Sequence, residues 1–323
     1  MRTYVIRRIL QMIPLLIGIS MISFFVLNLS PGDFLAQIEM NPDISSAVIA
    51  QMRAEFGLDQ PVWVQYFNWL KEVMQLNFGY SFAYRIPVTD LIGGRILNTF
   101  RLSLAATILT WVVAIPIGVH AAINRYTVRD NILTFFTFFG ISIPNFFFGL
   151  IILYFLARYG LFNLPVGGMT SWYHEELSFM GRMWDYIRHL IPPTIVLATS
   201  GMAGLMRQMR GQMMDAMGQD YVRTARSKGL SDRVVIYKHA LRNAINPLIT
   251  IFGFSISALL SGAAITEIVF SYPGLGNMLL TAVRQKDLYV AMAGLLMGSA
   301  LLILGNLLAD ILLAITDPRI RYN

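Results

Sequence analysis

Residues 288–315 read LYVAMAGLLMGSALLILGNLLADILLAI, and Asp310 is the only charged side chain in this stretch. A helix needs about 20 predominantly apolar residues to cross the hydrocarbon of a bilayer, because lipid offers no hydrogen-bond partner to backbone N–H and C=O groups. This stretch is long enough to cross and too apolar to lie in water. It predicts an integral membrane protein built from helices.

The same criterion selects more stretches along the chain, each with ends uncertain by a few residues. The one at 190–206 is the weakest, because it is short and opens with Pro192-Pro193. The first is longer than the apolar core of a signal peptide and has no A-x-A site after it, so we expect it to be retained. Together with 288–315, the stretches predict an all-α fold with six transmembrane helices; the other five are 9–29, 100–121, 132–157, 190–206 and 247–270.

Composition agrees with a lipid-facing surface. Hydrophobic residues make up 56% of the 323 residues and charged residues 13%, with a mean hydropathy of +0.58. A soluble domain carries about 25% charged residues. The net charge of +7 does not require a nucleic-acid partner, since the basic residues gather in particular loops. The absence of cysteine excludes disulfides, thiolate catalysis and Cys-ligated metals.

The basic residues also predict the orientation. If the N-terminus is cytoplasmic, the inside segments hold 15 of the 25 Lys and Arg residues, and the much longer outside segments hold the rest. This satisfies the positive-inside rule and places both termini in the cytoplasm of a bacterial-type cell membrane. The chain then divides into a first helix (1–29), an extracytoplasmic helical insertion (30–98), a five-helix core (99–316) and a cytoplasmic tail (317–323).

The insertion is expected to contain two helices. Residues 45–56 form the first, which Gly57 ends, and Pro61 opens a second with Trp63, Tyr66 and Phe67 at helical spacing. Two interpretations fit it. It is a lid packed on the membrane mouth, or it is a docking surface for a partner that delivers the substrate.

Residues 207–246 cannot lie in lipid. Their eight basic side chains would together cost roughly 20 kcal/mol or more at the bilayer centre, so the segment is a cytoplasmic loop. Asp220 is suited to be the N-cap of a short helix and Gly229 to follow its end, and Ser231 is suited to cap a second helix that ends before Pro247. One interpretation is a solvated loop whose basic residues only set the orientation of the chain in the membrane. The capped helix, with small residues beside a basic rim, favours a docking element.

Residues 220–230 (DYVRTARSKGL) and 239–244 (HALRNA) resemble the coupling loop of binding-protein-dependent ABC importer permeases, in the dipeptide, oligopeptide and nickel branch. The general motif of that family begins Glu-Ala-Ala, whereas this chain has Arg223-Thr224-Ala225, so no role of that glutamate transfers. The branch commonly shows this form. Further resemblance, in order along the chain, lies in YVIRRIL (4–10), PGD (31–33), LDQP (58–61), SIP (142–144), YPGLG (272–276) and DPRIRY (317–322).

The resemblance implies a function and a set of partners. The chain would be the permease subunit of an ATP-driven importer of peptides or related small solutes, and would form half of the translocation pathway with a second homologous permease. An extracytoplasmic binding protein would deliver the substrate. One or two cytoplasmic ABC ATPases would bind ATP and Mg and dock on the coupling loop, with Ala225 and Gly229 in contact. The expected coupling residues are Asp220, Tyr221, Arg223, Thr224, Ala225, Arg226, Lys228 and Gly229.

The sequence contains no recognisable site for ATP hydrolysis or ion coupling that would drive transport. A P-loop requires Gly-Lys-[Ser/Thr], and none of the four lysines (Lys71, Lys228, Lys238 and Lys286) follows a glycine. No ionisable residue lies in the middle of a predicted span, as an ion-coupled carrier would normally need, although Pro144-Asn145 leaves room for an unwound site. We expect no catalytic residue, metal site or cofactor in this chain. An ion-coupled secondary carrier and an integral membrane enzyme remain the alternatives, and His174-Glu175-Glu176 is interpreted as loop surface.

Small residues in the fifth span allow close approach of helices. Packing inside the bundle would explain them. The resemblance instead places Ser257, Ser261 and Gly262 near a pseudo-twofold interface that lines the pathway. Met202, Met206, Met209 and Met213 fall on one helical face and are expected to pack against neighbouring helices. No residue pattern identifies the substrate among peptides, nickel chelates, glutathione and sugars.

Overall fold

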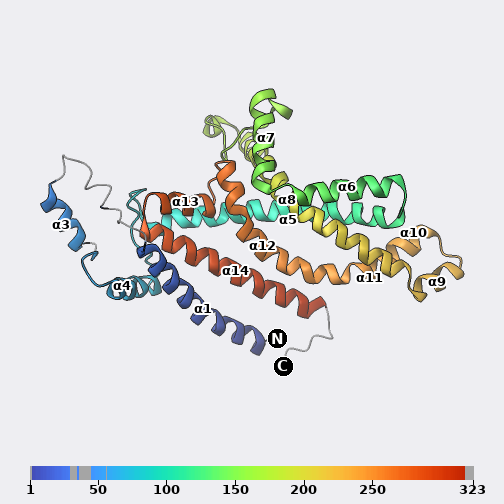
Figure 1. Ribbon diagram of the computed structural model, residues 1–323, viewed down its shortest axis with the longest axis horizontal. Coiled ribbons are helices and arrows are strands. Elements are labelled where there is room, and N and C mark those ends of the chain that lie inside the picture. Colours follow the sequence, from blue (N-terminus) through green and yellow to red (C-terminus); the bar gives the residue numbers. More distant parts are fainter. Residues whose placement is uncertain (1, 30–34, 36–44, 56, 317–323) are drawn as a thin grey trace. The chain divides into compact units, whose positions relative to one another are not determined.

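A computed structural model describes residues 2–29, 35, 45–55 and 57–316 of the chain (Figure 1). Helices dominate, and the described residues contain no strand, only an isolated bridge between Tyr80 and Pro87. The chain divides into two compact units, residues 1–99 with 273–303 and residues 100–272 with 304–323. Two long helices, α5 (Val88–Ile123) and α14 (Leu288–Thr316), contribute to both units.

The first unit contains the predicted insertion. It is built from α1 (Arg2–Asn28), α3 (Ser46–Glu55), α4 (Val62–Met74), α13 (Leu275–Arg284) and the adjoining parts of α5 and α14. Its core joins α1, α4, α13 and α14 through Phe24, Tyr66, Trp69, Met278 and Met292. The helices expected at 45–56 and after Pro61 are confirmed as α3 and α4, and Gly57 has a φ of +65° where the first one ends.

Polar contacts hold the insertion to the apolar helices of its own unit. The Tyr66 hydroxyl lies 3.0 Å from Ser20 Oγ on α1. Asp287, fully buried between α13 and α14, accepts hydrogen bonds from Ser81 Oγ at 2.7 Å and from the Ala83 backbone N–H at 3.0 Å. Buried polar groups are stable only with such partners. The insertion is therefore packed against its unit rather than tethered to it.

The second unit contains the predicted cytoplasmic loop and most of the core. After α5 come α6 (Val128–Ser142), α7 (Asn145–Tyr159) and the 39-residue α8 (Phe179–Met217), against which α6, α7, α11 and α12 pack. The chain then forms α9 (Asp220–Ser227), α10 (Asp232–Val234), the π-helix η3 (Val235–Ala240), α11 (Leu241–Ala244) and α12 (Asn246–Val269). Two 3₁₀ turns, Leu161–Asn163 and His174–Glu176, lie between α7 and α8.

Three helical stretches in the described part of the chain are long and apolar enough to cross a membrane: Ile6–Asn28, Val88–Ile123 and Leu288–Leu307. The two segments of α8, Phe179–Thr199 and Gly201–Met217, are bent by 48° and together give a fourth. The all-α membrane fold is confirmed, and the count of six spans stays a prediction. The span expected at 132–157 is divided into α6 and α7, because Pro144 has no N–H to continue a helix.

The methionines predicted to share one helical face do pack against neighbouring helices. Met209 and Met213 on α8 are fully buried, and Met206 is nearly so, in a core with residues of α5 and α12. Gly118 on α5 permits this approach, since a Cβ at that position would lie 2.7 Å from Met209 Cβ. The sequence period alone identified the buried face of α8, and the glycine opposite supplies the space for it.

Candidate functional site

The short helix α9 is anchored by two side chains on one face. Val222 and Ala225, three residues apart, are 0% and 4% exposed. They pack in the core that also holds Met209 and Met213 of α8 and Val235 of η3. The helix is therefore fixed to α8 and to the segment leading into α12. Its contacts with the rest of the unit are made by packed side chains.

The start of α9 differs from the prediction by one residue. Asp220 was expected as the N-cap, but it is the first helical residue, and Gln219 occupies the cap position without a side-chain hydrogen bond. Asp220 instead lies 3.5 Å from Arg223 Nη1 across the first turn. A carboxylate in the first turn is favourable beside the exposed N–H groups of a helix. The acidic residue still favours the helix start, although not as a cap.

The end of α9 is a Schellman motif, as the position of Gly229 predicted. The Leu230 N–H donates to the Ala225 carbonyl at 3.4 Å, and the Gly229 N–H donates to the Arg226 carbonyl at 2.9 Å. Gly229 has a φ of +75°, which glycine adopts without a Cβ penalty. No atom lies within 4 Å of a Cβ built there, so the site faces open space.

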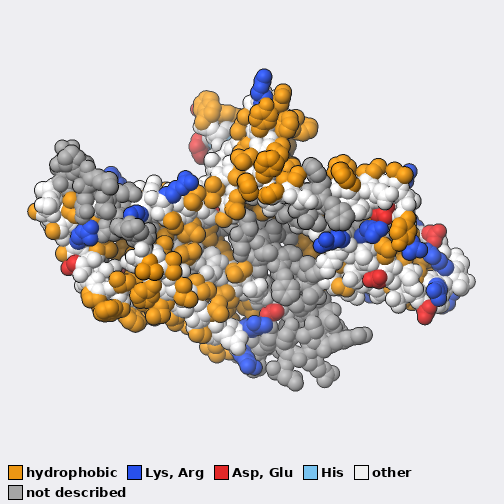
Figure 2. All heavy atoms as spheres, viewed as in Figure 1, with side chains coloured by type: hydrophobic (Ala, Val, Ile, Leu, Met, Phe, Trp, Pro, Cys, Tyr) orange, Lys and Arg blue, Asp and Glu red, His pale blue; other side chains and the backbone are white. Residues whose placement is uncertain are grey.

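The outward face of α9 is small and charged. The expected coupling residues Tyr221, Arg223, Thr224, Arg226 and Lys228 are exposed, whereas Ala225 points into the core of its own unit. Arg226 Nε lies 3.8 Å from Asp232 Oδ1, across the turn between α9 and α10. Lys and Arg side chains gather over this part of the molecule (Figure 2).

The helix after Ser231 is more irregular than expected. Ser231 precedes α10 without a side-chain cap, and α10 passes through η3 into α11. The segment ends at Ile245, next to α12, which carries Pro247 in its first turn. The predicted break ahead of Pro247 is thus confirmed, and the π-helix was not foreseen, because no local residue pattern specifies it.

An ion pair with a buried carboxylate, which the sequence reasoning missed, joins α6 to α8 in the same unit. Arg210 donates to Asp130 from Nε at 2.8 Å and from Nη2 at 2.7 Å, and the Tyr126 N–H donates to the same carboxylate at 3.0 Å. The Arg210 guanidinium holds the pKa of Asp130 below its usual range. The partners are 80 residues apart in sequence, so no local pattern reveals the pair.

Comparison with known proteins decides the family. Residues 114–322 match the binding-protein-dependent transport system inner membrane component, and residues 1–105 match the N-terminal part of such membrane components. The chain belongs to this family of transport permeases. It is similar along its whole length to the oligopeptide transport system permease protein AppB of Bacillus subtilis strain 168, with 44% identity over 100% of both chains.

Other relatives also match the permease over its full length. The dipeptide transport system permease protein DppB of Escherichia coli K12 is 36% identical, over 100% of this chain and 99% of its own. The glutathione transport system permease protein GsiC of Salmonella choleraesuis SC-B67 is 35% identical, over 100% of both chains. The permease is therefore the membrane component of an ABC importer and not an enzyme.

The expected pathway residues of the permease lie in α12. Ser257, Ser261 and Gly262 fall in the stretch 253–262, whose side chains lie outside the described residues. Their role stays a prediction.

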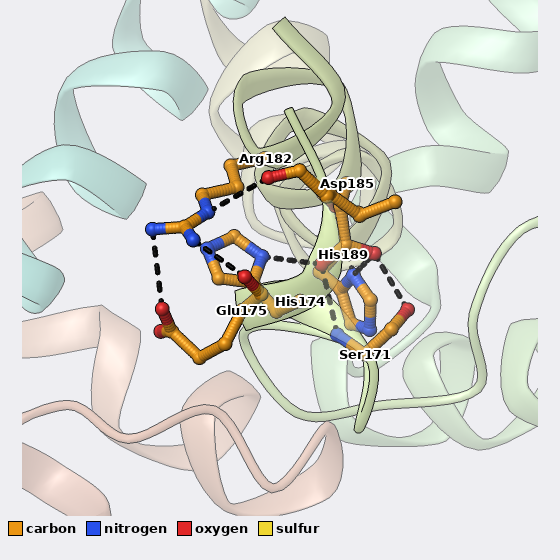
Figure 3. A network of polar contacts seen from close by, with 7 residues as sticks. Ser171, His174, Glu175, Arg182, Asp185 and His189 are labelled. Carbon is orange, nitrogen blue, oxygen red and sulfur yellow. Dashed lines mark hydrogen bonds and ion pairs between the residues drawn. The ribbon is translucent and has the colours of Figure 1, made fainter. Parts of the chain in front are cut away.

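The segment between α7 and α8 of the permease holds a second polar cluster, shown in Figure 3. Asp185 on α8 is 5% exposed and accepts hydrogen bonds from the Ser171 backbone N–H at 2.9 Å and from His174 Nδ1 at 2.8 Å. His189 Nδ1 lies 2.8 Å from the Asp185 carbonyl oxygen. The interpretation of His174 as plain loop surface is therefore corrected, because this side chain is partly buried and holds the connection to α8.

The buried Asp185 carboxylate is satisfied by hydrogen bonds from the Ser171 N–H, the Ser171 hydroxyl and His174 Nδ1, as a buried polar group requires. No group of His, Asp and Glu in the described part of the chain has the arrangement to hold a metal ion. The hydrogen bonds of Ser171 and His174 to Asp185 fix this part of the connection against α8.

Proposed function

We propose that this permease carries peptides or related small solutes inward and forms half of the translocation pathway with a second homologous permease. Its relatives named for oligopeptide, dipeptide and glutathione transport support this substrate class. The observation that carries the coupling role is α9, a short helix anchored by Val222 and Ala225 with a charged outward face.

Cytoplasmic ATPases that bind ATP and Mg are proposed to dock on α9. Asp220, Tyr221, Arg223, Thr224, Arg226, Lys228 and Gly229 form the contact surface, and Ala225 supports the helix from beneath. Because α9 packs on α8 and η3, closure of the ATPases would move the cytoplasmic end of α8. The ion pair between Arg210 and Asp130 would pass that movement to α6.

The proposed orientation follows the positive-inside rule, with both termini in the cytoplasm of the cell membrane. Residues 30–98 then form the extracytoplasmic insertion, on the side from which a substrate-binding protein would deliver solute. Residues 99–316 form the core with the coupling loop 207–246, and 317–323 form the tail. Ser257, Ser261 and Gly262 are proposed to line the pathway, as the small residues of α12 would allow two permeases to approach closely.

Affinity purification of the tagged permease from its native membranes tests the proposal, with mass spectrometry and an ATPase assay on the eluate. A second permease and one or two P-loop ATPases should accompany it. If the permease purifies alone and its reconstituted vesicles accumulate solute along an ion gradient, an ion-coupled carrier replaces the importer. Product formation by the lone chain would instead indicate a membrane enzyme.

A further inference from the structure

The segment from α10 to α11 carries a row of basic residues that an ordinary helix would scatter. Arg233 and Lys238 are five residues apart, and an α-helix with 3.6 residues per turn would rotate them by about 140° from each other. Lys238 lies inside the π-helix η3, and Arg233 lies in α10 just before it; the wider turn of a π-helix reduces the rotation between the two residues. Arg233 and Lys238 accordingly line the same surface hollow.

An open groove lies on this face. It has a volume of about 580 Å³ and is lined by Arg233, Val234, Tyr237, Lys238 and Arg242. Tyr237 is 55% exposed and provides an aromatic wall, while Val234 provides an aliphatic one. Three cationic groups and two apolar surfaces thus share one hollow.

The three cations of the groove are not neutralised within the described part of the chain. Three other basic residues of the loop have carboxylate partners: Arg210 has Asp130, Arg223 has Asp220 and Arg226 has Asp232. No carboxylate of the described residues forms an ion pair with Arg233, Lys238 or Arg242. The groove is therefore a local concentration of positive charge that favours an anionic ligand.

We propose that this groove binds the phosphate of an anionic phospholipid. Arg242 lies four residues before Asn246, where the apolar α12 begins, which is about 6 Å along a helix and places it at the level of the lipid head groups. Tyrosine is enriched at the same level, and the cytoplasmic leaflet carries the anionic lipids that basic pockets beside membrane helices bind. The inference rests on the proposed cytoplasmic position of residues 207–246.

Native mass spectrometry of the purified transporter, titrated with phosphatidylglycerol or phosphatidylcholine, tests this directly. The double variant Arg233→Gln/Arg242→Gln should bind phosphatidylglycerol with an affinity reduced roughly tenfold or more, since each basic residue near the surface contributes about fivefold. Binding of phosphatidylcholine should not change. The matched control is Lys71→Gln/Arg284→Gln, which removes two exposed charges on α4 and α13 and should behave as the wild type.

The outcomes separate the possible sources of the anion. Inorganic phosphate at millimolar concentration should fail to displace the lipid, and displacement by it would indicate a site for free phosphate. Equal affinity of the double variant and the wild type for phosphatidylglycerol would overturn the proposal. Loss of the ATPase subunits from the variant, with lipid binding unchanged, would assign the groove to the ATPase interface instead. Binding to the purified protein depends neither on sidedness nor on uptake, so its failure would leave the proposed function standing.

Discussion

Two short helices outside the apolar spans, α4 and α9, are anchored in the same way but expose surfaces of different chemistry. Each buries a pair of residues three apart, Tyr66 and Trp69 in α4 and Val222 and Ala225 in α9. The outward face of α4 carries Trp63 and Phe67, both 62% exposed, whereas that of α9 is charged. The anchors show which helices are fixed to their unit. From the exposed faces we expect α4 to bind an apolar surface and α9 a polar groove.

The largest expected effect is on the turn that ends α9. Gly229→Arg should abolish transport while membrane insertion stays intact, because it places a bulky cation on the docking face and strains a left-handed position by about 1–2 kcal/mol. Uptake and ATPase activity of the reconstituted transporter measure this.

The matched control is Gly229→Asn, since asparagine tolerates the left-handed conformation. It should keep most of the uptake. Normal uptake by Gly229→Arg would contradict the assignment of α9 as the coupling helix.

The aromatic anchor of α4 should matter for stability rather than for coupling. Tyr66→Ala removes a fully buried ring and its contact with Ser20, and should destabilise the permease by about 3–5 kcal/mol. Thermal unfolding of the purified protein measures it. Trp63→Ala, on the exposed face of the same helix, should be close to the wild type, and an equal loss in both variants would contradict the division into anchor and surface.

The ion pair between Asp130 and Arg210 should survive an exchange of its partners. Asp130→Ala leaves the Arg210 guanidinium, which is 28% exposed, without its carboxylate, and should cost about 1–3 kcal/mol. Exchanging the partners, Asp130→Arg with Arg210→Asp, should recover part of the stability and of the uptake. If the exchanged pair behaves no better than the single variant, the two groups do not act together.

The smallest expected effect concerns the Asp185 cluster. Asp185→Asn replaces one carboxylate oxygen, an acceptor for the Ser171 N–H and His174 Nδ1, by a donor group, and should destabilise the permease by about 1 kcal/mol. Thermal unfolding of the purified protein measures it. An unfolding temperature equal to that of the wild type would mean that these hydrogen bonds do not hold the connection to α8.

The sequence predicted most of what local patterns specify. Apolar runs identified the helices, the methionine spacing identified the buried face of α8, and Gly229 identified the end of α9. Contacts between residues far apart in the sequence were not predicted. The pair between Asp130 and Arg210 and the contacts of His174 with Asp185 join positions that no periodicity links. The break between α6 and α7 was foreseen only as an option, because Pro144 interrupts a helix without fixing where the next one lies.

The most direct test of α9 as the docking element uses the absence of cysteine from the chain. Thr224→Cys introduces a single thiol on the exposed face of α9, and Phe67→Cys introduces one on the exposed face of α4. Labelling by a membrane-impermeant maleimide is then compared in detergent between the permeases alone and the full transporter. The account predicts that the ATPases protect Cys at 224 and leave Cys at 67 reactive. Equal labelling at 224 with and without the ATPases would contradict it.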